Sequence, residues 1–155
     1  MVKRLSVSWF FFACLAGSLN AQQQLLKEHE EPLKIVKKYF DALKAQDTVA
    51  FKNVFLKNAY TYYVLEIKDS VIVGGKPIFP NVFKDNRVID EHMLKQGVRV
   101  ELHKRIAMVW VPYDLWLNQN FSYCGVDMFS LVKTNAGWKI AAITSTVEKE
   151  GCVNK

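Results

Sequence analysis

The stretch Phe121–Glu148, FSYCGVDMFSLVKTNAGWKIAAITSTVE, decides the fold. Residues that favour β-structure fill both of its halves, and the polar segment 134–137, Thr-Asn-Ala-Gly, separates them. Gly137 supplies the positive φ that a tight turn often needs. The stretch therefore predicts two long antiparallel strands that close a small α+β domain.

One acid, Asp127, stands among apolar neighbours in the first of these two strands. A carboxylate in such a run is expensive to bury unless it is hydrogen-bonded or protonated. A turn at residues 135–136 would place Thr144 opposite Asp127. Two interpretations follow: Asp127 belongs to a functional site, or it is a buried acid satisfied by the backbone or by Thr144.

The N-terminus has the pattern of a targeting segment. Two basic residues precede an apolar run, Val7–Leu19, and a small residue, Ala21, ends a cleavage site. This is typical of a secretory signal peptide over residues 1–21, and the run is too short to span a bilayer comfortably. We expect a secreted, periplasmic protein. A retained membrane anchor and a lipoprotein carrying its lipid on Cys14 are the alternatives.

Cleavage would leave one domain, because 155 residues less 21 is 134. We expect a linker over residues 22–30, the domain over 31–150 and a tail over 151–155. The net charge of +6 falls to +4 without the two basic residues of the leader. The basic clusters lack the interleaved aromatic residues of a nucleic-acid surface. We therefore predict no nucleic-acid partner, and no membrane contact after cleavage.

Cys124 and Cys152 are the two cysteines of the mature chain. An even number of cysteines in an oxidising compartment favours a disulfide. The expected strand register places Cys124 opposite Val147, so a bridge requires the tail to bend back after Glu148, which Gly151 would permit. The alternative is two separate thiols, one in the sheet and one on the tail.

Helices are expected before the strands. Apolar residues recur at helical spacing over Glu30–Lys44, and Asp47 is a suitable N-cap for a second helix, Thr48–Phe55. From Ala59 onward the chain mostly favours β-structure. The order predicts an α+β fold in which N-terminal helices pack on a curved, mostly antiparallel sheet.

Three features of the predicted sheet are less regular. Gly74-Gly75 is expected to end a strand, and Pro112 marks a bulge or an edge within a long apolar strand. Residues 85–96 have no clear pattern.

Two groups of segments resemble the nuclear transport factor 2-like superfamily, the α+β cone shared by ketosteroid isomerases and SnoaL-like polyketide cyclases. The first group is residues 37–47, KKYFDALKAQD, with 51–59; the second is 109–113, VWVPY, 124–127, CGVD, and 137–140, GWKI. The second group is most similar to the exported bacterial branch named for lumazine binding. The resemblance implies a cone-shaped pocket between the helices and the concave sheet face, and often a homodimer through the open sheet face. The superfamily contains enzymes, binders and scaffolds.

The resemblance also implies a site. In ketosteroid isomerases a tyrosine of the first helix and a protonated aspartate of a late strand form an oxyanion hole, and another aspartate is the base. Tyr39 and Asp127 match the first two positions, but the base position falls near Tyr63, where this chain has no carboxylate. The remaining candidates for a base are Glu66, Asp114 and His92.

We predict that the ligand-binding residues are Asp127, Tyr39, Tyr63, Trp110, Tyr113 and Trp116. No zinc spacing, phosphate loop or nucleophile triad is present in the sequence, so we expect no cofactor and no metal. The leading hypothesis is an exported domain that binds a small, partly apolar molecule, or a dimeric accessory module. The alternative is an isomerase or polyketide-cyclase-like lyase that acts next to a carbonyl, with Asp127 and Tyr39 stabilising an oxyanion. The enzyme requires a second titratable group that faces Asp127.

Overall fold

The computed structural model describes residues 29–68, 70–79 and 88–153 of the chain. The expected signal peptide, Cys14 and most of the 22–30 linker lie outside the described residues. Residues 29–45 are helical, and a short helix, α2 (Thr48–Asn53), follows. The described strands are β1 (Phe55–Ile67), β2 (Ser70–Pro77), β3 (Ile89–Met93), β4 (Arg99–His103), β5 (Ile106–Leu117), β6 (Asn120–Thr134) and β7 (Gly137–Val147).

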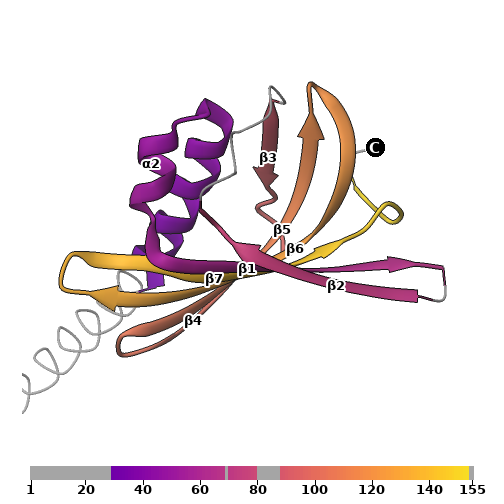
Figure 1. Ribbon diagram of the computed structural model, residues 1–155. Coiled ribbons are helices and arrows are strands. Elements are labelled where there is room, and N and C mark those ends of the chain that lie inside the picture. The colour runs from indigo at the N-terminus through magenta and orange to yellow at the C-terminus, as the bar shows by residue number, and fades with distance from the viewer. Residues whose placement is uncertain (1–28, 69, 80–87, 154–155) are drawn as a thin grey trace, which may run out of the picture.

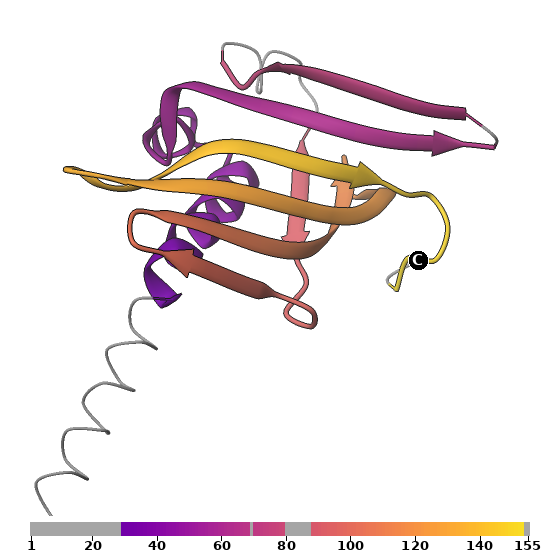
Figure 2. The same ribbon diagram turned by 90° about the horizontal axis from the view of Figure 1, so that it is seen from below.

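These strands form a single curved sheet in the order β2-β1-β7-β6-β5-β3, with β4 also paired to β5. β1 and β7 run parallel, and the other pairs of described strands are antiparallel. The helices cover one side of the sheet, and β3, β5 and β6 rise beside them (Figure 1). Figure 2 shows the strands of the sheet side by side from below. The predicted α+β architecture is confirmed.

Aromatic side chains form much of the core between the helices and the sheet. The rings of Phe40 and Phe129 lie 5.9 Å apart, and those of Phe51 and Phe55 lie 4.9 Å apart. Val36, at helical spacing from Phe40, is fully buried. Each such side chain contributes roughly 1.5–3 kcal/mol by leaving water, so the apolar face of the first helix fixes it on the sheet.

Asp47 is the N-cap of α2, as predicted, because its carboxylate accepts hydrogen bonds from the backbone N–H groups of Val49 and Ala50. The expected helix Thr48–Phe55 is too long at its C-terminal end. The N–H of Ile140 donates to the carbonyl of Val54, which draws the chain into the sheet so that β1 begins at Phe55.

The expected end of a strand at Gly74-Gly75 is wrong, because β2 continues to Pro77. Aromatic rings from β1 lie over both glycines: a Cβ on Gly74 would lie 2.2 Å from the ring of Tyr63, and one on Gly75 would lie 2.7 Å from the ring of Tyr62. The glycines therefore continue the strand and make room for neighbouring rings.

Pro112 lies in a position that resembles an edge, although β5 is an interior strand. β3 pairs with β5 up to Tyr113, and β4 pairs with it from Trp110. The carbonyl of Pro112 accepts from the N–H of Leu94 in the connection between β3 and β4. The N–H that proline lacks thus falls where neither partner strand requires it.

The pairing of β6 with β7 agrees with the predicted register only close to the turn. Thr134 pairs with Gly137, as expected, but the register shifts by one residue between Ser130 and Leu131. Beyond this bulge, Asp127 pairs with Ser145 and Cys124 with Glu148. The expected partners, Thr144 and Val147, are therefore wrong, because one extra residue in β7 moves every later pairing.

Within the described residues, no helix is long and apolar enough to cross a membrane.

Candidate functional site

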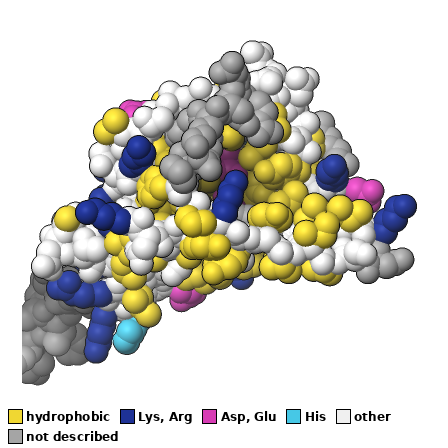
Figure 3. Space-filling view, in the orientation of Figure 1, with side chains coloured by type: hydrophobic (Ala, Val, Ile, Leu, Met, Phe, Trp, Pro, Cys, Tyr) yellow, Lys and Arg dark blue, Asp and Glu magenta, His cyan; other side chains and the backbone are white. Residues whose placement is uncertain are grey.

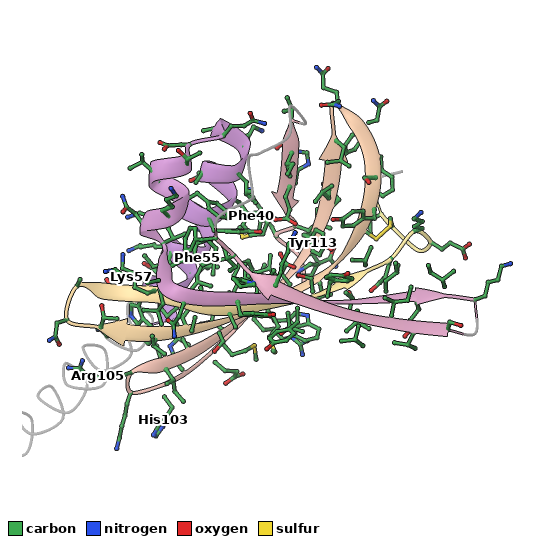
Figure 4. The ribbon with its side chains drawn as sticks, viewed as in Figure 1. Phe40, Phe55, Lys57, His103, Arg105 and Tyr113 are labelled. Atoms are coloured by element: carbon green, nitrogen blue, oxygen red, sulfur yellow. A yellow bond between two sulfur atoms is a disulfide. The ribbon has the colours of Figure 1, made fainter. Side chains whose placement is uncertain are left out.

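The concave side of the sheet, between the first helix and the strands β3, β5 and β6, holds a group of buried polar side chains. Tyr39 comes from the helix, Glu91 from β3, Tyr113 from β5 and Asp127 from β6, and all four are buried. In Figure 4, Phe40 is labelled beside the helix and Tyr113 beside β5 and β6. The fold thus gathers three ionisable residue types on the concave side of the sheet.

Asp127 lies at the centre of this group and is 1% exposed. Its Oδ1 accepts a hydrogen bond of 2.5 Å from the hydroxyl of Ser145 on β7. Its Oδ2 is buried and has no hydrogen-bond partner within the described residues. Burial raises the pKa of Asp127 from 3.8 to about 7, although the bond from Ser145 opposes that rise. Asp127 is therefore able to hold or release a proton near neutral pH.

Glu91 is the second acid of the site. Its Oε2 accepts a hydrogen bond of 2.8 Å from the hydroxyl of Tyr39. Burial, together with the charge of Asp127, raises the pKa of Glu91 well above its usual value, and the bond from Tyr39 opposes this. The ion pairs among the described residues include neither Glu91 nor Asp127. Two carboxyl groups therefore share an apolar space with no described cation to pair with them.

The tyrosines of the site remain protonated at neutral pH. Burial and the nearby carboxyl groups raise the pKa of Tyr39 and that of Tyr113 far above the usual value. The hydroxyl of Tyr113 donates to the carbonyl of Thr146 at 2.7 Å, and its ring meets that of Tyr123 edge-on. Tyr39 is thus a hydrogen-bond donor to Glu91, and Tyr113 is held by β7.

A second polar cluster lies on the opposite face of β3 and β5. Glu91 and His92 are adjacent in β3, so their side chains point to opposite faces. His92 contacts Asp114 through Nδ1 at 2.8 Å and Asp90 through Nε2 at 3.0 Å. The indole of Trp116 donates to the same oxygen of Asp114 at 3.0 Å. The two sequence candidates for a base, Asp114 and His92, therefore pair with each other on this face.

The other predicted residues lie in different places. Tyr63 is on the same sheet face as its neighbour Ser145, but its ring lies over β2. Trp110 is on the face away from the helices, where the guanidinium of Arg99 lies 4.9 Å from its ring. Glu66, the third candidate for a base, is exposed on β1. Of the six predicted ligand-binding residues, Tyr39, Tyr113 and Asp127 come together around the buried space.

Sequence reasoning missed Glu91 and Ser145. Glu91 lies in the stretch 85–96, whose pattern is unclear because β3 has only five residues. The segment Ile89–Met93 has three polar residues in succession, and this pattern does not say which acid faces inward. Ser145 was missed because the bulge in β7 places it opposite Asp127, where the predicted register places Thr144.

Cys124 and Cys152 are joined by a disulfide with Cα atoms 5.8 Å apart. The backbone N–H and C=O of Cys124 bond those of Glu148, and the chain then turns through Gly151, whose φ is +73°. The tail thus bends back as the bridge requires. The bridge fastens β6 to the tail three residues before Asp127.

No group of three or more potential metal-ligating side chains that could hold an ion occurs in the described part of the chain. The donors present, two acids, tyrosines and a serine, suit proton transfer and hydrogen bonding.

Residues 27–144 match the model of a protein family described as "Putative lumazine-binding". No curated protein matches the chain significantly. Among solved structures, a nuclear transport factor 2-like protein of unknown function from Shewanella baltica has 15% identity and a TM-score of 0.56, over 79% of this chain and 95% of that one. A Novosphingobium aromaticivorans protein described as "Putative Scytalone Dehydratase" has 11% identity and a TM-score of 0.62, over 81% of this chain and 87% of that one. At such identities these likenesses establish the fold alone.

Proposed function

Because this chain belongs to the family described as "Putative lumazine-binding", within the nuclear transport factor 2-like superfamily, we propose that it is an enzyme whose reaction takes place at the carboxyl groups on the concave side of its sheet. The proposed reaction is proton transfer next to a carbonyl group of a small, partly apolar molecule, leading to isomerisation or to loss of water. The observation that carries the proposal is the pair of buried carboxyl groups, Glu91 and Asp127, with raised pKa values.

The two acids have different roles because their surroundings differ. Asp127, with a pKa of about 7, is partly ionised at neutral pH. Its Oδ2, which has no hydrogen-bond partner within the described residues, takes the proton from carbon in this assignment. Glu91, whose pKa is raised well above its usual value by burial and by the charge of Asp127, is the acid in this assignment, and in its neutral form it donates its proton to a carbonyl oxygen or to a departing hydroxyl group. Two carboxyl groups in one apolar region do not both ionise readily, so one keeps its proton as the acid while the other becomes the base.

The neighbouring hydroxyl groups support these roles. Ser145 donates to Asp127 and so favours its ionised form, which is the form a base requires. Tyr39 donates to one oxygen of Glu91 and leaves the other to carry the proton. This assignment gives Tyr39 a positioning role toward Glu91, in place of the direct oxyanion contact expected from the resemblance.

The sequence hypothesis of a binder without catalysis required only Asp127 and aromatic residues. Glu91 supplies the second titratable group that the enzyme requires, and this favours the enzyme. The likeness to a protein described as a dehydratase agrees with a reaction that removes water, although it carries no residue roles. Export through a signal peptide at residues 1–21 is part of the proposal and is supported by the disulfide, since disulfides persist in oxidising compartments.

The test is hydrogen–deuterium exchange at the carbon next to the carbonyl of 2-tetralone in D₂O, followed by NMR. The parent should accelerate exchange, with a rate that rises with pH through an apparent pKa near 7. Asp127→Asn should lose about 10²- to 10⁴-fold of the acceleration.

Asp114→Asn is the matched control, because Asp114 is also a buried aspartate of this sheet but lies on the opposite face. It should leave the exchange rate unchanged. No acceleration by the parent, or equal rates for the parent and Asp127→Asn, would refute proton transfer by Asp127 and leave a binding role.

A further inference from the structure

The ends of β1 and β2 form a hairpin that exposes apolar side chains on both of its faces. The two strands pair from Tyr60–Pro77 to Ile67–Ser70, and this hairpin projects beyond the other strands in two views (Figure 1 and Figure 2). A two-stranded ribbon gains little from its own packing, and clustered exposed apolar groups usually mark a binding surface. Its exposed apolar residues are Tyr62, Tyr63, Ile67, Val71, Ile72 and Val73.

One face of the hairpin is continuous with the carboxyl pair. Tyr63 pairs with Ser145 of β7, the residue whose hydroxyl bonds Asp127. Alternate residues share a face, so Leu65 and Ile67 continue this face, and Ile72 joins it as the partner of Leu65. We call Tyr63, Leu65, Ile67 and Ile72 the inner apron. Val71 and Val73 lie on the opposite face of the same strand.

Gly74 shapes the inner apron. A Cβ at this position would lie 2.2 Å from Cζ of Tyr63, so any larger residue would force the ring of Tyr63 to move. Glycine therefore lets the ring of Tyr63 lie across β2 and widen the apolar surface beside the site.

An open cleft lies beside Leu65 and Ile67 of the inner apron. β1 and β7 separate after the pair Leu65–Val147, because the chain turns at Glu148 toward Cys124. The cleft between residues 64–68 and 146–150 has a volume of about 660 Å³. From Tyr63 to Ile67 the strand runs roughly 13 Å. Figure 3 shows hydrophobic side chains gathered on this side of the molecule, beside an acidic side chain near the centre of the view.

We propose that the molecule held by this site is an amphiphile with an uncharged polar head and an apolar chain or ring system about 13 Å long. The head, a carbonyl or hydroxyl group, lies at Glu91 and Asp127, so this inference rests on the proposed function. The apolar part lies on the inner apron. An anionic head is disfavoured, because the described residues place no ion-pair partner beside the two acids.

The position of the inner apron favours a ligand over a second copy of this chain. The inner apron lies on the side of the sheet that carries Ser145 and the concave site, at its open end. An elongated small molecule bound at the carboxyl groups would extend from them along this face.

The test measures binding of methyl ketones from 2-hexanone to 2-dodecanone by isothermal titration calorimetry. Affinity for the parent should increase about two- to fourfold for each added methylene and then level off. Ile72→Glu should abolish this dependence on chain length. Val73→Glu, the adjacent position on the opposite face, should keep it; Ile72 and Val73 are 45% and 67% exposed, so the two variants expose a similar new charge.

Two outcomes would overturn the inference. If affinity does not depend on chain length while Asp127→Asn still weakens binding, the inner apron holds no ligand and the carboxyl site stands. If light scattering shows that Ile72→Glu converts a dimer to a monomer with the chain-length dependence unchanged, the inner apron is a contact between copies. A failure of the proposed function would be seen separately, because the parent protein would then not accelerate deuterium exchange in 2-tetralone.

Discussion

Replacing Asp127 by asparagine should change how the stability of the folded protein depends on pH. In the folded state burial raises the pKa of Asp127 from 3.8 to about 7, whereas the unfolded chain exposes the same group to water. The folded state therefore holds this proton more tightly than the unfolded state. The contribution is favourable at low pH and is lost as pH rises from the unfolded pKa through the folded pKa.

The size of the effect follows from the two pKa values. A rise from 3.8 to about 7 corresponds to about 4 kcal/mol in the free energy of unfolding. Most of this contribution is lost in a pH range in which unfolding can be measured: roughly 2–3 kcal/mol is lost between pH 5 and pH 8. Asparagine cannot ionise, and its amide oxygen still accepts from Ser145. The variant should therefore lack this contribution and become more stable relative to the parent as pH rises.

The measurement is denaturant unfolding of both proteins at several pH values from 5 to 8, with the disulfide intact. Taking the difference between the two proteins cancels the groups that titrate alike in both. Asp127→Ala is the second variant: it leaves the hydroxyl of Ser145 without its partner and should cost roughly 1–3 kcal/mol more than asparagine. A stability difference that stays constant over this pH range would show that Asp127 has an ordinary pKa, and the acid–base assignment would fail.

Three further predictions concern the surroundings of the site. Tyr39→Phe removes the bond that lowers the pKa of Glu91, so that pKa should rise further in a carboxyl NMR titration; an unchanged value would contradict the contact. Reducing the bond between Cys124 and Cys152, which are 28 residues apart, should lower the free energy of unfolding by about 3.5 kcal/mol in a denaturant titration, and no change would show that the bridge does not stabilise the fold. Gly125→Ala should destabilise the fold by at least 1–3 kcal/mol, because its Cβ would lie 2.1 Å from a backbone oxygen of β7; a melting temperature equal to that of the parent would refute this packing.

Local patterns were enough to predict the architecture. Helical spacing located the first helix, and Asp47 at its N-cap position located α2, because both signals depend on neighbours in the sequence. The β-favouring residues on both sides of the polar turn at 134–137 located the last hairpin. Gly74 failed as a signal, since the reason for glycine there is the ring of Tyr63 on another strand. The sequence pattern within one segment does not show which residues of another segment it will contact.

The site depended on such distant relations. Asp127 was recognisable because an acid in an apolar strand is unusual. Its partner was mispredicted because the bulge in β7 exchanges Thr144 for Ser145, and a bulge leaves no reliable mark in a sequence. Glu91 was hidden because three polar residues follow one another in a short strand, and only the fold shows which of them faces Tyr39.

The contrast between the two buried aspartates argues for catalysis at Asp127. Asp114 is equally buried on the other face of the sheet, where Trp116 and His92 both contact its Oδ1. Asp127 has one donor, and its second oxygen has none within the described residues. Keeping that acid costs about 4 kcal/mol once it ionises, a large part of the 5–15 kcal/mol that stabilises a typical domain. A binder that needed only a hydrogen bond would obtain it from asparagine without this loss, whereas a base requires a carboxylate.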